Sequence, residues 1–459
     1  MSCRLSSFRF GGRLPPCLCA ALLCLFGCDA LPDWLAGSGD PGENIVALLS
    51  GATGSFGNVD ESDSGGGFEN AQPVNLPEYG KLSVHGALTG GGDIDIYRFG
   101  PTRAGEVLVV EVNNTSADTR AAVFDEHYGI VVANDDRNYY AGQRDPRIQN
   151  TLRSDHDVIY VAVAGKGNSI GLFGNPVGGT DYDMIVTRAA GLSKPQPRPQ
   201  PVWVELGGGQ GVRIAGEPPQ DVPPFNVEAI SPRYAGDREK ILDLMYEELT
   251  ADYVEYNVEF RRSDRDAPYT EPYSILYVGG FNSNYLGLAD NVDWYNGEAV
   301  QEAIVYSETL RLFDSLFASP EQIARALGNV AAHELGHLLG LDHTLDSTSV
   351  MSEAASAQSI MQLDAGLIAA QLNARVFPIG MQDAPFKLAL GVGLRDPFAS
   401  LDEFLALKAA ERDRRADEAA TYSLNVESTE ALTGEGAAGG NISGDLTLKS
   451  LGLRMCSDR

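Results

Sequence analysis

Cysteine and basic residues are scarce in this chain of 459 residues. Five of its six cysteines lie within the first 28 residues, so only Cys456 is left beyond them and no disulfide framework holds the fold. The formal net charge is −29, from 63 acidic and 34 basic side chains. Because phosphate contacts require a basic surface, this balance argues against a nucleic-acid partner. It indicates a well-hydrated, exported protein.

Long apolar runs are also missing: no run after the N-terminus is long enough to span a membrane. Three early arginines are followed by an apolar stretch, residues 14–26, which is too short to cross a bilayer and is typical of an export signal. The stretch ends Leu25-Phe26-Gly27-Cys28, which resembles a bacterial lipobox and implies lipidation of Cys28. The alternative is an ordinary signal peptide cut nearby. We expect a protein at the bacterial cell envelope, facing periplasm or exterior, with the membrane contacted only through this N-terminal anchor.

Shifts in composition divide the rest of the chain. A Gly-, Asp- and Ser-rich stretch precedes residue 72, and an alternating proline run at 194–201 favours a semi-rigid polyproline II spacer between two independently folded units. The expected parts are a signal peptide (1–27), a flexible tether (28–71), a β-sandwich (72–190), a Pro-rich linker (191–201), a second domain (202–390) and a C-terminal helix with an irregular tail (391–459).

Residues 72–190 alternate with a period of two and carry turn residues about every 8–12 positions, which predicts an all-β sandwich. The order resembles the bacterial pre-peptidase C-terminal (PPC) domain, a small β module attached to secreted proteases. The matching pieces are residues 92–99, the Gly105 turn and residues 134–136. Four carboxylates in these pieces could group around calcium, or could equally be solvated turn residues: Asp93, Asp95, Asp135 and Asp136.

The second domain reads as strand, helix, strands, helix. Residues 237–250 and 320–339 show helical periodicity, the latter with Ser319 as N-cap and Pro320 at the first helical position. A third helix is expected at 359–373, and a charged helix at 398–421 has apolar residues that could dock on a domain surface.

The densest motif of the chain is His333-Glu334-Leu335-Gly336-His337-Leu338-Leu339-Gly340-Leu341-Asp342-His343. On a helix, His333 and His337 lie on one face within reach of one ion. Gly340 permits a tight exit from the helix, which brings His343 back as a third ligand. Three neutral imidazoles with one open position are typical of catalytic zinc, and Glu334 could hold a water beside the metal. The alternatives are solvated histidines on a surface helix or a site that no longer binds metal.

Met351 follows His343 by eight residues in a predicted tight turn. Here the sequence resembles the metzincin clan of zinc endopeptidases, and its matrixin branch most. The resemblance implies an α+β domain with a mixed twisted sheet and three main helices, and Met351 as the "Met-turn" beneath the metal. Three features depart from matrixins: Thr344 replaces the usual serine, no Pro-x-Tyr follows Met351, and no Pro-Arg-Cys-Gly motif lies upstream. The substrate pocket and the latency mechanism therefore do not carry over.

The sequence predicts a zinc-dependent endopeptidase acting on protein or peptide substrates, with Glu334 as general base and then general acid. Two alternatives stay open. One is a lipid-anchored binding or adhesion protein with an inactive protease-like domain, and the other is a zinc hydrolase acting on a non-peptide amide. The sequence assigns no role to residues 430–459.

Overall fold

The computed structural model describes residues 56–62, 66–89, 92–138, 141–166, 179–189, 191, 193–214, 216–353, 356–395, 401, 403–408, 448–451 and 453–456. The predicted signal peptide and the Cys28 lipidation site lie outside these residues. Within them, no helix is both long enough and apolar enough to cross a membrane.

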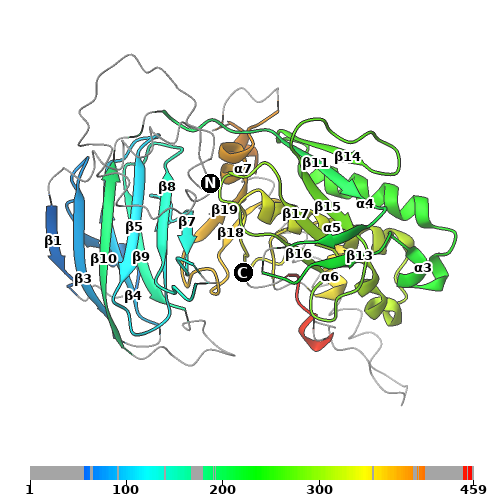
Figure 1. Cartoon of the computed structure of the whole chain (residues 1–459), viewed down its shortest axis with the longest axis horizontal. Helices are drawn as coiled ribbons and strands as arrows, with labels where there is room; N and C mark the ends of the chain where they lie inside the picture. Colours follow the sequence, from blue (N-terminus) through cyan, green and yellow to red (C-terminus); the bar gives the residue numbers. More distant parts are fainter. Residues whose placement is uncertain are drawn as a thin grey trace, which may run out of the picture. The chain divides into compact units, whose positions relative to one another are not determined.

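Residues 56–189, called the β region below, fold into two five-stranded sheets (Figure 1). The first sheet has the order β1 (Phe56–Asp60), β3 (Lys81–Leu88), β10 (Thr180–Ala189), β5 (Val107–Asn113) and β8 (Arg147–Thr151). The second has the order β2 (Gln72–Pro73), β4 (Ile94–Phe99), β9 (Ile159–Gly165), β6 (Thr119–Phe124) and β7 (Ile130–Asn134). Neighbours are antiparallel except in the pairs β1–β3 and β2–β4. A short 3₁₀ turn, η2 (Phe68–Asn70), precedes β2.

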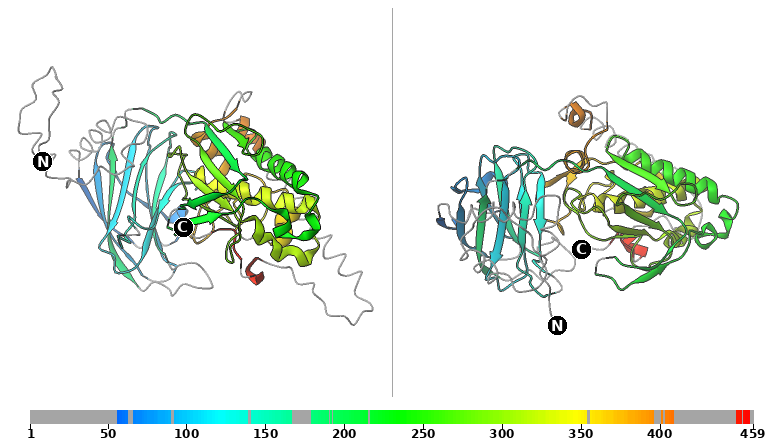
Figure 2. Two further views of the ribbon diagram at one scale, coloured as in Figure 1. Left: turned by 45° about the vertical axis from the view of Figure 1, so that its right-hand side comes forward. Right: turned by 45° about the horizontal axis from the view of Figure 1, so that its top comes forward.

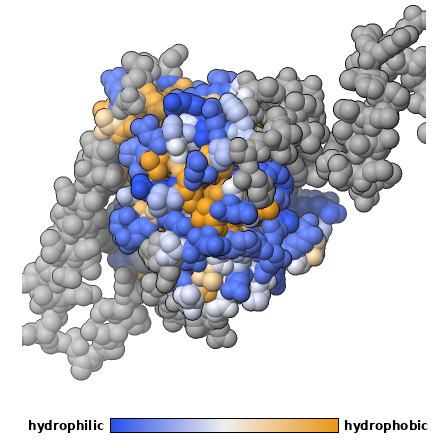
Figure 3. All heavy atoms as spheres, turned by 90° about the vertical axis from the view of Figure 1, so that its left-hand side faces the viewer, coloured by the Kyte–Doolittle hydropathy of each residue, from blue (hydrophilic) through white to orange (hydrophobic). Residues whose placement is uncertain are grey.

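The two sheets share one apolar core. Val84 and Val110 of the first sheet cluster with Val123 and Val161 of the second, and all four are fully buried. Alternation along each strand directs these side chains to one face, as the period of two requires. The side of the β region shown in Figure 3 is largely hydrophilic around a central apolar patch.

The outer face of the second sheet is covered as well. All six residues of β6 are buried, because Leu372 and Phe377 of the second domain join an apolar cluster on this face. The rings of Phe124 and Phe377 meet edge to face with centroids 5.4 Å apart. The β region and the segment around residue 377 therefore share a core, although the sequence predicted independently folded units.

The second domain is built on one mixed sheet of order β14-β11-β15-β17-β16, in which only the edge strand β16 is antiparallel to its neighbour. Its strands are β11 (Gln200–Glu205), β14 (Val258–Arg262), β15 (Ser274–Val278), β16 (Gly287–Ala289) and β17 (Glu302–Val305). Two small hairpins accompany it: β12 (Gly209–Val212) with β13 (Gln220–Val222), and β18 (Ala369–Gln371) with β19 (Met381–Asp383). The helices are α3 (Val227–Ile230), η3 (Pro232–Tyr234), α4 (Arg238–Asp252), η4 (Ser307–Leu316), α5 (Pro320–Leu338), α6 (Ala357–Gln362), α7 (Ala384–Gly391) and η5 (Leu448–Leu451).

The long helices α4 and α5 pack against the sheet (Figures 1 and 2), where Ile241 and Leu327 join Val204 and Leu276 in the main core. Helix α5 begins as predicted at Ser319, whose hydroxyl accepts from the backbone of Gln322. The Gln322 side chain accepts in return from the Ser319 backbone, which completes a capping box. This local signal fixes where the motif-bearing helix starts.

The predicted third helix at 359–373 is wrong in extent. Helix α6 ends at Gln362, and residues 369–371 form strand β18 instead. The backbone of Gly366 bonds with that of Thr348 and Val350, at 2.9 and 3.0 Å, so this segment pairs with the chain near Met351. Tertiary pairing here overrides the helical pattern.

The structure also bears on the predicted Pro-rich linker and on the predicted helix at 398–421. The predicted linker is packed against the second domain. The backbone N–H of Arg198 donates to the carbonyl of Gly391 (2.9 Å), and its guanidinium donates to that of Asn296 (2.7 Å). Strand β11 begins at Gln200, inside the predicted linker. The predicted helix at 398–421 is helical at its described residues 401 and 403–408. Its Phe404 is fully buried in the main core, which agrees with the predicted docking.

Candidate metal centre

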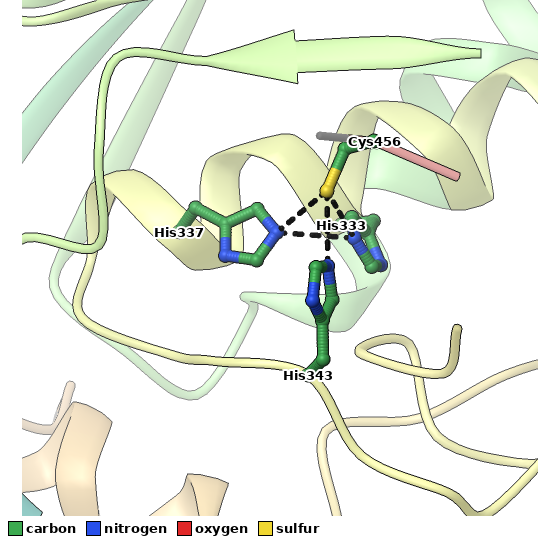
Figure 4. Close-up of side chains that lie close together, drawn as sticks. All are labelled: His333, His337, His343 and Cys456. Atoms are coloured by element: carbon green, nitrogen blue, oxygen red, sulfur yellow. Dashed lines mark hydrogen bonds between the residues drawn. The ribbon is translucent and has the colours of Figure 1, made fainter. Parts of the chain in front are cut away.

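Helix α5 and the turn after it bring three histidines to one point (Figure 4). His333 and His337 are one turn apart on α5, and His343 lies on the loop that follows. The turn depends on Gly340, which has φ 92°. A Cβ at this residue would lie 2.6 Å from the Tyr295 nitrogen, so both its backbone conformation and its surroundings exclude a side chain.

Backbone carbonyls orient two of the rings. The Nδ1 of His333 donates to the carbonyl of Val350, and the Nδ1 of His337 to that of Leu341, each at 2.8 Å. These bonds leave the Nε2 lone pairs directed inward, as ligating histidines require. Burial lowers the pKa of His333 to about 4 and that of His337 to about 3, and it holds the pKa of His343 well below its ordinary value. The rings are therefore neutral and able to bind a metal.

The spacing of the ring nitrogens fits a tetrahedral ion. The Nε2 atoms of His333 and His337 lie 3.1 Å apart, and with both Nδ1 atoms protonated this places two lone pairs face to face. Two nitrogens bound to zinc at about 2.0–2.1 Å would be about 3.3 Å apart. A shared cation removes the repulsion between the lone pairs, so the geometry favours a metal over three independent imidazoles.

Cys456 completes the cluster. Its Sγ lies 2.9 Å from Nε2 of His343, 3.3 Å from that of His337 and 3.6 Å from that of His333. Three histidines and one cysteine are a donor set that zinc prefers. Sequence reasoning left this thiol without a role. The one available signal was that no other cysteine follows residue 28.

Glu334 is buried between α5 and the edge strand β16. Among the residues that the structure describes, neither oxygen of its carboxylate has a hydrogen-bond partner, and burial raises its pKa well above the ordinary value. The carboxylate lies against Gly287, where a Cβ would collide with it. A buried polar group without a partner is costly, so its presence near the convergent nitrogens of three histidines points to a chemical role.

Met351 lies beneath the site in a tight turn. Ser352 donates to the carbonyl of Ser349 at 3.0 Å, and Thr344 donates to that of Met351 at 2.9 Å. The Met351 side chain is fully buried against Gly336, where any Cβ would meet its sulfur. Met351 therefore packs against the helix that carries His333 and His337, and its role as a Met-turn stays a prediction.

The four aspartates proposed for calcium do not form one group. No three of Asp93, Asp95, Asp135 and Asp136 lie close enough to share an ion in the described part of the chain. Asp95 accepts from the hydroxyl of Tyr182 at 2.8 Å, and burial raises its pKa to about 8. The other pair, after β7, binds Lys166. These contacts favour the turn-residue interpretation, with Asp95 as a buried exception.

Residues 237–368 match the family model of the matrixins, Peptidase_M10. This span includes the three histidines, Glu334 and Met351. The match supports a metzincin-like protease domain and suggests a zinc metallopeptidase, for which the histidine cluster is suited. The β region lies outside the match. No curated protein matches the chain.

Similar solved structures include three of low identity. Archaemetzincin from Methanopyrus kandleri is 17% identical over 37% of this chain and 88% of its own, with a TM-score of 0.22. The pre-peptidase C-terminal domain of collagenase from Bacillus anthracis is 14% identical over 26% and 93%, with a TM-score of 0.19. PliG of Aeromonas hydrophila, a periplasmic inhibitor of g-type lysozyme, is 15% identical over 29% and 99%, with a TM-score of 0.20. These TM-scores are too low to establish a shared fold or function.

Proposed function

We propose that this chain is an exported zinc endopeptidase that hydrolyses peptide bonds in protein or peptide substrates. The observation that carries the proposal is the unpartnered carboxylate of Glu334 beside three convergent imidazoles. A structural zinc site has no use for such a group, whereas peptide hydrolysis needs a base next to the metal.

The roles of the residues follow from this arrangement. His333, His337 and His343 would hold zinc, which supplies a Lewis acid that polarises a scissile carbonyl and makes water acidic. Glu334 takes the proton of the attacking water and passes it to the leaving amine, so it acts first as base and then as acid. Gly287 leaves room for the Glu334 side chain, and the outer edge of β16 offers backbone groups to an extended peptide.

The test is isosteric removal of the carboxylate. Glu334→Gln should keep zinc but lower peptide cleavage by about 10²–10⁴-fold, because general acid–base catalysis contributes about that much. Glu321→Gln is a matched control: the same substitution in the same helix, at a side chain that is half exposed and paired with Lys240. Chelator-sensitive cleavage of a peptide library, with zinc measured by elemental analysis, gives the readout. Unchanged cleavage by Glu334→Gln would remove this residue from its role.

The location of the enzyme is also a proposal. We infer export through the N-terminal signal and lipid attachment at Cys28, so that the catalytic domain faces periplasm or exterior. Cys28→Ala should release the protein from the membrane fraction, and mass spectrometry of the native N-terminus should show the lipid. A protein that stays in the membrane fraction as Cys28→Ala would contradict the anchor.

A second candidate function is favoured by Cys456. Four protein ligands close a zinc site, and a closed site is structural. On this view the chain is a lipid-anchored binding or adhesion protein with an inactive protease-like domain. Cleavage by any form of the purified chain that disappears with chelator and with Glu334→Gln would exclude this alternative. A hydrolase of non-peptide amides would leave the whole peptide library uncut.

A further inference from the structure

Residues 453–456, near the C-terminus, lie on the edge of the sheet that carries β16. Residues 448–451 and 453–456 are called the C-terminal strap below. Its second part, residues 453–456, runs beside the segment Asn284–Gly287 that leads into β16. Leu286 and Gly287 donate to the carbonyls of Arg454 and Met455 at 3.0 and 2.9 Å, and Arg454 donates back to Asn284 at 2.8 Å. The strap therefore uses the backbone groups that an extended peptide would use if it added to this sheet.

Apolar side chains of the strap are buried in the second domain. Leu448, Leu453 and Met455 are each at most 3% exposed and belong to the main core cluster. Met455 forms one wall of a small pocket of about 20 Å³. The other walls come from α5, the Met351 turn and α6, and include Asn329, Val350, Ile360 and Leu363. With Met455 in place, this space holds about one water molecule and has no room for the side chain of a substrate.

The next residue reaches the metal centre. Cys456 is 3% exposed, and its sulfur lies within 3.6 Å of all three Nε2 atoms. The thiol stands where the fourth ligand of a tetrahedral ion would stand, the position that a hydrolytic zinc leaves open for water. One short segment thus covers the sheet edge, the side-chain pocket and the open metal position together.

We propose that the C-terminal strap is a built-in inhibitor, in which Cys456 closes the metal and residues 453–455 occupy the substrate-binding edge. This inference rests on the proposed peptidase function. The thiol binds as a thiolate and gives its proton to solvent, as metal ligation requires. Because the strap belongs to the same chain as the metal centre, its binding is intramolecular and is not diluted as a separate inhibitor would be. Activity then requires displacement of the strap.

Metal spectroscopy tests the ligand without using activity. In the full chain loaded with Co²⁺, the thiolate should give a sulfur-to-cobalt charge-transfer band, which the difference spectrum against Cys456→Ser isolates from the other cysteines. Glu321→Gln is the control, because it changes a half-exposed side chain at the start of α5 and leaves the strap and the thiol in place. We expect the band in the wild type and in Glu321→Gln. A wild type without the band overturns the inference.

Cleavage assays test the inhibition. Cys456→Ser should cleave a peptide library about 10-fold faster than the wild type or more, a difference of about 1.4 kcal/mol. Glu321→Gln should match the wild type. Equal, measurable rates for Cys456→Ser and the wild type overturn the inhibitor and leave the peptidase standing. A thiolate band with no cleavage by any metal-loaded form overturns the peptidase and the inhibition together.

A measurement on the wild type tests the thiolate ligand even if the Cys456→Ser chain does not fold. Peptide mapping after alkylation should show Cys456 protected in the zinc-loaded chain and alkylated faster after chelation. A synthetic peptide of residues 448–459 should also compete for the site better than the same peptide with serine at 456. Equal alkylation with and without metal contradicts the thiolate ligand.

Discussion

The β region and the metal centre both bury ionisable groups, and the two places differ in how these groups are paired. In the β region Glu106 and Arg188 are buried together, and the guanidinium donates to both carboxylate oxygens at 2.6 and 2.9 Å. In the metal centre Glu334 has no such partner among the described residues, and the histidines direct their lone pairs at one another. Buried groups that satisfy each other hold a fold together, whereas convergent, unsatisfied groups indicate that something else binds there.

The strongest test of this difference is loss of one imidazole. His337→Ala should abolish metal binding and peptide cleavage, since a site of three histidines loses its geometry with any one of them. Elemental analysis should find little zinc after dialysis. The β region should keep its own structure, so its far-ultraviolet β signal should persist. Stoichiometric zinc in His337→Ala would mean that His337 is not a ligand.

The matching change in the β region should affect stability alone. Glu106→Gln leaves the Arg188 guanidinium buried without its counter-charge, which typically costs about 3–5 kcal/mol. Denaturant unfolding should show this loss, while zinc content and cleavage per folded molecule should be unchanged. A Glu106→Gln variant with normal stability and impaired zinc binding would contradict a purely structural role for this ion pair.

Gly340 forms the turn between helix α5 and His343. Gly340→Ala adds a side chain at φ 92°, where the Cβ also meets the backbone of Tyr295 and Asp293. We expect a loss of about 3 kcal/mol and weaker zinc binding, because the turn positions His343. Gly211→Ala is the control: its φ is 62°, but nothing lies within 4 Å of the added Cβ, so about 1–2 kcal/mol is expected. Equal zinc affinity in the two variants would show that the turn does not position the ligand.

The sequence predicted the parts of the site that are local and missed those that depend on distant contacts. Helix α5, its cap at Ser319 and the glycine turn follow from residues within a few positions of one another. Cys456 is 113 residues from His343, so no spacing rule connects them, and only the three-dimensional structure places the thiol beside the three imidazoles. The prediction of the third helix was wrong in extent for the same reason. Gly366 pairs with Val350, a contact between two segments that local periodicity does not connect.

The smallest expected effect concerns Asp95, a buried carboxyl group whose neighbours include the Tyr182 hydroxyl and the carboxyl groups of Glu61 and Asp93. Burial raises its pKa to about 8, although Tyr182 donates to it. The unfolded chain releases this proton near pH 4, whereas the folded chain keeps it until near pH 8. The carboxyl therefore lowers stability progressively as the pH rises through that window, by at most about 1.4 kcal/mol per unit.

Asp95→Asn should remove this pH dependence because the amide does not ionise while its oxygen still accepts from Tyr182. Between pH 5 and pH 7 the wild type should lose about 2 kcal/mol relative to the variant, measured by urea unfolding at both pH values. If Asp95 were instead a carboxylate held for a calcium ion, Ca²⁺ would stabilise the wild type and not Asp95→Asn. Parallel pH profiles for the two proteins would contradict the raised pKa of Asp95.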